Sequence, residues 1–206
     1  MNKDIYIFGS TVRGETEKNS DIDVLVIVSD KAMQLKIPDT WSVYPDATIE
    51  KYYETGRLFA WHLHLEAKCI FSDRTTSFLE TLGEPNPYSA HKNDFENLRD
   101  ILYESLGEIR AGSNSQIFEI GIIYTALRDI AMIASTKLLT RPCFSRYSPY
   151  ALPISFPLSK GIYESAIKAR LLSTRGLRAD IDPVFISKKL TSAPIKDWID
   201  KIGAML

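Results

Sequence analysis

The spacing of apolar and polar residues differs between the first third of the chain and the remainder. Largely apolar segments over residues 4–8, 21–28 and 41–44 predict strands, and the segment 21–28 is typical of a strand buried on both faces. Residues 48–54 and 58–66 predict helices, and residues 68–71 predict a further strand. The first third therefore favours a small mixed α/β domain.

Apolar residues beyond this region recur at helical spacing. The Pro- and Gly-containing segment 81–89 predicts a linker. Residues 95–109 predict an amphipathic helix, 117–139 a central helix that is apolar nearly all round, and 162–173 and 195–202 closing helices. Four prolines predict an irregular loop over 141–157. We expect an α+β protein, with a mixed-sheet domain over residues 1–81 followed by an all-α helical domain over residues 90–206.

Composition limits the classes of function. The 206 residues are 45% hydrophobic and 25% charged, which is typical of a globular protein. Lys and Arg number 25 and Asp and Glu 26, so the net charge of −1 predicts no general attraction to nucleic acid or membranes. Two cysteines are too few for a disulfide framework. Charged residues interrupt the apolar segment 117–139, which argues against a membrane span, and we expect a cytoplasmic protein.

The candidate chemistry lies between the first two predicted strands. Gly9 lets the backbone turn sharply and approach a ligand, while the N–H groups of such a turn and the Ser10 hydroxyl can bind a phosphate. Asp21 and Asp23 are two residues apart, so on a strand their carboxylates point to the same face. Adjacent carboxylates repel each other unless a cation neutralises them, and hard oxygen ligands suit Mg²⁺. This combination is what metal-assisted transfer of a phosphorus-containing group requires.

The segment GSTVRGETEKNSDID resembles the signature of the nucleotidyltransferase superfamily that includes DNA polymerase beta. More narrowly it is similar to the minimal and kanamycin nucleotidyltransferase-like proteins, in which an α/β catalytic domain precedes a helical domain. The resemblance extends to SVYPDATIEKYYETGRLFAWHLHLE, FEIGIIYTALRDIAM and PCFSRYSPYAL. It implies that Gly9 and Ser10 hold a triphosphate, with Arg13 as a further nucleotide contact. It also implies that Asp21 and Asp23 bind Mg²⁺, expected as two ions, and that the nucleotide is an NTP, with ATP as the expected donor.

The sequence departs from that family at two places. A third carboxylate is expected just before Ser42-Val43-Tyr44, but Thr40 stands there and Asp39 is one residue away. A slip of one residue turns a side chain to the opposite face of a strand, although a bulge can restore it, so we take Asp39 as the third catalytic carboxylate. The helix that usually precedes the first strand is also missing, and we expect a partner or a second copy to cover that side of the sheet.

Three further patterns bear on function. Residues 137–178 carry eight basic residues and one acidic residue, interleaved with aromatic residues. This composition has two explanations: Arg146 and Tyr147 contact the nucleotide or the acceptor, or the basic residues form an ordinary solvated face. His62 and Glu66 in WHLHLE share one face of a helix, and a packed helix explains them better than a metal site. No histidine follows Arg128, so the Arg-x₄₋₆-His motif of ribonuclease toxins is absent, and a contact between Arg128 and Asp129 is expected.

The expected function is Mg-dependent transfer of a nucleoside monophosphate, AMP from ATP, to a hydroxyl of a protein, a small molecule or an RNA. The alternative is a catalytically weak nucleotide-binding or antitoxin-type module that acts by binding a toxin-type partner. The residue at Thr40 motivates this alternative. Pyrophosphate release separates the two, because both predict nucleotide binding and only the enzyme turns over.

Overall fold

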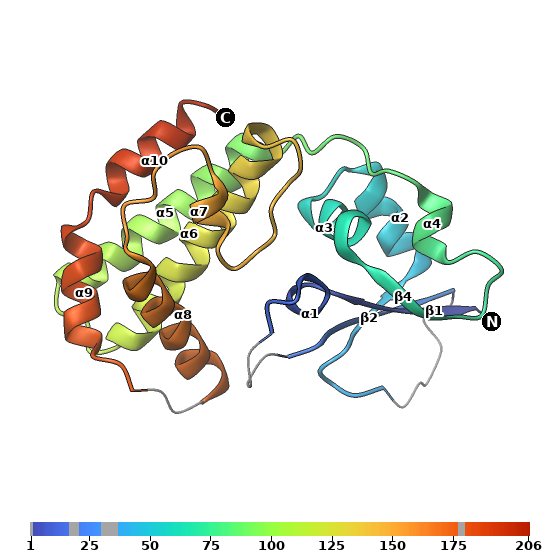
Figure 1. Ribbon diagram of the computed structural model, residues 1–206, viewed down its shortest axis with the longest axis horizontal. Coiled ribbons are helices and arrows are strands. Elements are labelled where there is room, and N and C mark those ends of the chain that lie inside the picture. The colour runs from blue at the N-terminus through green and yellow to red at the C-terminus, as the bar shows by residue number, and fades with distance from the viewer. Residues whose placement is uncertain (1, 17–20, 30–36, 177–179) are drawn as a thin grey trace. The chain divides into compact units, whose positions relative to one another are not determined.

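The computed structural model describes residues 2–16, 21–29, 37–176 and 180–206. The chain forms two compact units (Figure 1). The first contains residues 1–90 together with the short segment 144–146, and the second contains residues 91–143 and 147–206. The domain boundaries 1–81 and 90–206 stay a prediction.

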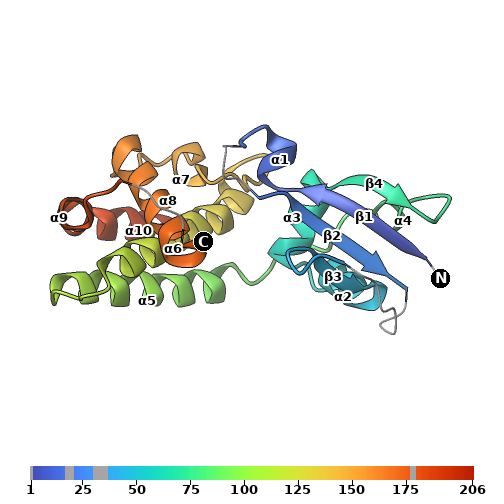
Figure 2. The ribbon, with the colours of Figure 1, turned by 90° about the horizontal axis from the view of Figure 1, so that it is seen from below.

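The first unit is built on a four-stranded mixed sheet with the order β3-β2-β1-β4 (Figure 2). β1 pairs antiparallel with both β2 and β4, whereas β2 and β3 are parallel. The predicted strands are confirmed, with end points that differ by a residue or two. Their bounds are β1 Lys3–Phe8, β2 Asp23–Val28, β3 Ser42–Pro45 and β4 Lys68–Ser72.

Three helices cover one face of this sheet (Figure 1). Alternate residues of β1 and β2 point to the same face, so Tyr6, Phe8, Leu25 and Ile27 form one core with apolar residues of the helices. Val24, Val26 and Val28 on the other face of β2 are also buried, which confirms a strand buried on both faces. The helices are α2 Asp46–Glu54, α3 Leu58–Glu66 and α4 Phe78–Leu82.

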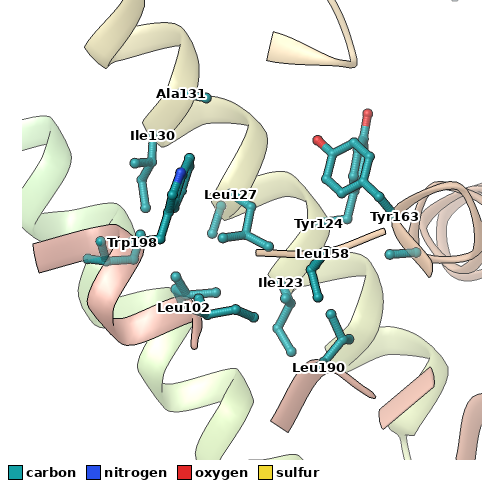
Figure 3. Packing of buried hydrophobic residues seen from close by; sticks show 14 of the residues in the cluster. Leu102, Ile123, Tyr124, Leu127, Ile130, Ala131, Leu158, Tyr163, Leu190 and Trp198 are labelled. Carbon is teal, nitrogen blue, oxygen red and sulfur yellow. The ribbon is translucent and has the colours of Figure 1, made fainter. Parts of the chain in front are cut away.

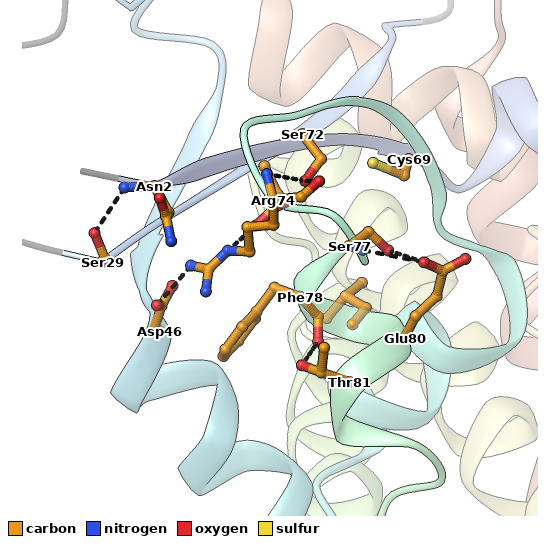
Figure 4. Close-up of polar contacts among 12 residues, drawn as sticks. Asn2, Ser29, Asp46, Cys69, Ser72, Arg74, Ser77, Phe78, Glu80 and Thr81 are labelled. Carbon is orange, nitrogen blue, oxygen red and sulfur yellow. Dashed lines mark hydrogen bonds and ion pairs between the residues drawn. The ribbon is translucent and has the colours of Figure 1, made fainter.

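An arginine ties the N-terminal strand to the start of α2 (Figure 4). The Nε of Arg74 donates to Oδ2 of Asp4 at 2.8 Å, and its Nη2 donates to Oδ2 of Asp46 at 2.7 Å. Asp4 is completely buried, so its carboxylate has lost its hydration, and the ion pair with Arg74 compensates for that loss. The guanidinium also stacks over the ring of Phe78, at 4.8 Å from the ring centroid.

The second unit is an all-helical bundle with its own core (Figure 3), so the α+β class is confirmed. The central helix α6 is apolar on nearly all sides because α5, α7, α8 and α9 all pack against it. Gly121 on α6 allows close approach to α8, since a Cβ there would lie 3.1 Å from the Cα of Arg170. The helices are α5 His91–Arg110, α6 Gln116–Leu138, α7 Ser148–Ala151, α8 Lys160–Arg175, α9 Pro183–Ser192 and α10 Ile195–Gly203.

Besides the single turn α1 (Ser10–Arg13), three of the described helices were not predicted from the sequence. α4 and the single turn of α7 are short, and α7 lies inside the segment predicted as an irregular loop. The sequence Asp182-Pro183 is a recognisable signal for the start of α9, since Asp is favoured as a cap and Pro in the first turn. In the structure Asp182 accepts a hydrogen bond from the backbone N of Phe185. Within the described residues, none of the helices combines the length and apolar character that a membrane crossing requires.

Candidate functional site

A sharp turn joins β1 to the short helix α1 (Ser10–Arg13) and is made by Gly9. Its φ of 70° and ψ of −145° belong to a region that essentially only glycine occupies. The carbonyl of Gly9 accepts hydrogen bonds from the backbone N of Val12 and of Arg13, and the N of Glu15 donates to the carbonyl of Ser10 at 2.9 Å. Gly9 and Ser10 therefore lie at the start of a closed turn.

Asp23 lies directly against this turn. It is the first residue of β2, and the register pairs it with Phe8, the residue before Gly9. A Cβ built on Gly9 would lie 2.3 Å from Oδ2 of Asp23, so any side chain at this position requires the Asp23 carboxylate to move. The absence of a side chain at Gly9 is what lets the carboxylate reach the backbone of the turn.

Asp21 lies two residues ahead of β2, outside the strand in which we predicted it. Asp21 and Asp23 are both exposed to solvent. Residues 17–20 of the predicted turn lie outside the described residues. Both side chains are thus exposed to solvent, and Asp23 lies beside the Gly9 turn.

The position expected to carry a third carboxylate lies just before β3. β3 pairs with β2 in a parallel register that begins at Leu25 and Ser42. Asp39 and Thr40 lie in an exposed turn ahead of these first paired residues. Strand pairing therefore places neither Asp39 nor Thr40 beside Asp23, and the role of Asp39 stays a prediction.

Arg13, at the end of α1, takes part in a network of charged groups. Its Nε donates to Oε2 of Glu15 at 3.0 Å, and its Nη1 donates to Oε2 of Glu66 on α3. The same Glu66 oxygen is 2.9 Å from Nε2 of His62, one helical turn earlier. Burial opposes ionisation of Glu66, but the hydrogen bonds and charges of His62 and Arg13 outweigh it, so the pKa of this carboxyl is lowered. These contacts fix α1 against α3.

Segment 144–146 contacts the same network. The Phe144 ring stacks on the His62 ring, with 4.5 Å between centroids and an interplanar angle of 14°. Ser145 Oγ donates to Oε1 of Glu15 at 2.7 Å, and Nη2 of Arg146 donates to the Glu15 carbonyl at 3.2 Å. Arg146, predicted as a nucleotide contact, therefore lies in the first unit, beside the turn.

Tyr147, the other residue predicted from the basic region, belongs to the second unit. It is half-buried, its hydroxyl contacts Glu164 at 3.5 Å, and Lys160 lies over its ring. In the same unit, the expected contact between Arg128 and Asp129 is confirmed, with Nε 2.7 Å from Oδ1. Arg178, which was counted in the basic region, lies outside the described residues.

A family model described as the nucleotidyltransferase domain matches residues 2–81. Residues 2–81 are a nucleotidyltransferase domain. This assignment confirms the superfamily resemblance of the sequence and an enzyme of the nucleotidyltransferase type. The matched range contains the Gly9 turn, both aspartates and the entire sheet.

The other comparisons are less informative. One solved structure that matches is a spectinomycin adenyltransferase from Enterococcus faecialis with ATP and spectinomycin. The identity is 14% and the TM-score 0.45, and the match covers 98% of this chain and 91% of the other. No curated protein matches the sequence. The family assignment therefore rests on the nucleotidyltransferase domain itself.

The residues of the nucleotidyltransferase domain fit a magnesium–nucleotide complex. Asp21 and Asp23 offer hard carboxylate oxygens, and the Gly9 backbone leaves room for the Asp23 carboxylate. Within the described part of the chain, no three His, Cys, Asp or Glu side chains are grouped to hold a metal. Two carboxylates are nevertheless sufficient for Mg²⁺, which is commonly bound by one or two protein carboxylates, substrate phosphates and water.

Sequence reasoning missed Glu15 and the role of Glu66. Glu15 lies between Gly9 and Asp21, inside the segment that carries the resemblance, but its sequence position gives no indication that residues 145 and 146 contact it. A signal for Glu66 was present, since the sequence placed it on the same helix face as His62, with which it pairs in the structure. Its contact with Arg13 spans 53 residues and depends on the fold.

Proposed function

We propose that the protein transfers a nucleoside monophosphate, AMP from ATP, to a hydroxyl of an acceptor molecule. The observation that carries the proposal is the fit of the Asp23 carboxylate against the glycine-only turn at Gly9. A nucleotide bound at this turn would bring its phosphates to Ser10 and to the two exposed aspartates. The family of the domain supports the type of reaction.

The reaction forms a bond between the acceptor oxygen and the α-phosphorus and breaks the bond to the β-phosphate, which leaves as pyrophosphate. Asp21 and Asp23 would hold Mg²⁺, expected as two ions, while Gly9 and Ser10 bind the triphosphate and Arg13, Arg146 and Tyr147 supply further nucleotide contacts. Bound Mg²⁺ would neutralise phosphate charge and lower the pKa of an acceptor hydroxyl. The protein's contribution is to position these groups before the reaction. Asp39 is our proposal for the third carboxylate.

The acceptor is proposed only as a class: a small molecule, a hydroxyl of a protein, or an RNA end. The test incubates the protein with Mg²⁺, host lysate and each of the four α-labelled nucleoside triphosphates, and then separates small molecules, RNA and protein. Label in one fraction that disappears with Asp21→Asn/Asp23→Asn supports the proposal. Label transfer retained in full by the double variant would show that the site is assigned wrongly.

A second readout does not depend on finding the acceptor. Mn²⁺ in place of Mg²⁺ allows metal binding to be followed by electron paramagnetic resonance in the presence of ATP. We expect ATP-dependent Mn²⁺ binding that the double variant loses, because both carboxylates are removed without a change in side-chain volume. Unaltered binding would contradict the assignment of these ligands.

The second candidate is a nucleotide-binding or antitoxin-type module without efficient turnover. Thr40 favours it, because a hydroxyl stands just before β3, at the sequence position where the family resemblance leads us to expect a carboxylate. ATP-dependent Mn²⁺ binding without pyrophosphate release in any lysate fraction would support this candidate. Restored or increased release in Thr40→Asp would identify Thr40 as the reason.

A further inference from the structure

Glu15 uses every one of its polar groups to fix the turn that follows Gly9. Its backbone N donates to the Ser10 carbonyl at 2.9 Å, and its own carbonyl accepts from Arg146 at 3.2 Å. Its two carboxylate oxygens accept separately, Oε1 from Ser145 at 2.7 Å and Oε2 from Arg13 at 3.0 Å. One half-buried residue thus joins the turn to a segment 130 residues away in the sequence.

The same segment contacts the turn by a second route. Phe144 is only 3% exposed and stacks on His62, whose ring also packs edge-on against Phe8. His62 contacts Glu66, and Glu66 accepts from Arg13. The contacts therefore close a ring that runs from segment 144–146 through α3 and α1 and back to Glu15.

We propose that Glu15 is a positioning residue for the triphosphate of the nucleotide, and that segment 144–146 holds it in place. This inference rests on the proposed function, since it concerns the same site. Ser10 lies at the start of the turn that Glu15 closes, and its carbonyl accepts a hydrogen bond from the backbone N–H of Glu15. When Glu15 loses its other contacts it becomes less constrained, and its hydrogen bond then holds Ser10 less firmly. A turn held before ligand arrival binds phosphate more tightly, because less freedom is lost on binding.

The chain offers a matched control for the hydroxyl of Ser145. Ser77 Oγ donates to the carboxylate of Glu80 at 2.8 Å, the same chemistry at nearly the same length, in the capping box at the start of α4. Ser145→Ala and Ser77→Ala each remove one hydroxyl that donates to a glutamate. A general loss of stability would affect both variants, whereas a positioning role affects only Ser145→Ala.

The test measures two quantities in the full-length protein. Hydrogen–deuterium exchange reports the backbone of residues 10–16, and Mn²⁺-dependent binding of a fluorescent ATP analogue reports affinity. We expect Ser145→Ala to accelerate exchange in residues 10–16 and to weaken binding about tenfold, because a hydrogen bond to a charged group is removed. Ser77→Ala should leave both quantities unchanged, and Ser145→Thr, which retains the hydroxyl, should restore the affinity.

The outcomes separate the positioning role from the proposed function. Wild-type protein that binds no nucleotide would refute the proposed function. Binding by the wild type that Ser145→Ala leaves unchanged, or that Ser77→Ala weakens equally, would refute the positioning role alone. Glu15→Gln provides a second variant, since an amide cannot accept hydrogen bonds at both of its terminal atoms, and it should reproduce the loss of affinity.

Discussion

Replacement of Gly9 by alanine tests directly whether the turn and Asp23 work together. The added Cβ would lie 2.3 Å from Oδ2 of Asp23, and real Cβ contacts essentially never fall below 3.0 Å. The carboxylate, or the turn itself, must therefore move by at least about 0.7 Å, the difference between those two distances. Displacements of about 1 Å in an active site can cost about 100-fold in rate.

A matched control separates this displacement from backbone strain. Gly83 has φ 68° and ψ −139°, nearly the dihedral angles of Gly9, but nothing lies within 4 Å of a Cβ built there. Each alanine should cost about 1–3 kcal/mol in the free energy of unfolding, because both backbones occupy a region disfavoured for residues with a side chain. Only Gly9→Ala should also displace Asp23.

The assay compares the two variants in urea denaturation, in ATP-dependent Mn²⁺ binding and in pyrophosphate release. We expect similar losses of stability, but weaker metal–nucleotide binding and about 100-fold slower release for Gly9→Ala alone. The reasoning is refuted if Gly9→Ala binds and turns over like Gly83→Ala, since the Asp23 carboxylate would then not depend on the space at Gly9.

Two further predictions concern stability. Arg74→Met should lower the free energy of unfolding by about 3–5 kcal/mol in urea denaturation, because it leaves the buried Asp4 carboxylate without its ion-pair partner. Asp4→Asn in the same background should recover part of this loss. No recovery would contradict the role of the Asp4 charge. Burial and the nearby Lys137 charge lower the pKa of His91 below its usual 6.5. In the folded protein the His91 imidazole therefore binds a proton less readily than it does in the unfolded chain. The contribution of His91 to the free energy of unfolding is present above about pH 6.5 and is lost as the pH falls through the pKa of the folded state. The drop in melting temperature between pH 7.5 and 5 should be smaller in His91→Gln than in the wild type, and an equal drop would contradict this assignment.

The pattern of residues along the chain was sufficient to predict the strands, the longer helices and the candidate site residues Gly9, Ser10, Asp21 and Asp23. The strands were predictable because largely apolar segments of four to eight residues have the length of strands and are shorter than most helices, and the central helix α6 because its length and all-round apolar character require burial. Gly9, Ser10, Asp21 and Asp23 were recognisable because the turn and the carboxylates lie close together in the chain. Short helices such as α4 and α7 escaped notice because a single turn contains too few residues to show a period.

Which distant residues surround the turn depends on the packing of the folded chain. The contact of Ser145 with Glu15 joins residues 130 positions apart, and that of Arg13 with Glu66 joins residues 53 apart. No local pattern encodes such pairs, because their partners are brought together by the packing of α3 on the sheet and by the path of segment 144–146. The parallel pairing of β3 with β2, which begins at Leu25 and Ser42, is likewise a tertiary result, since strand pairing fixes neighbours that spacing along the chain leaves open.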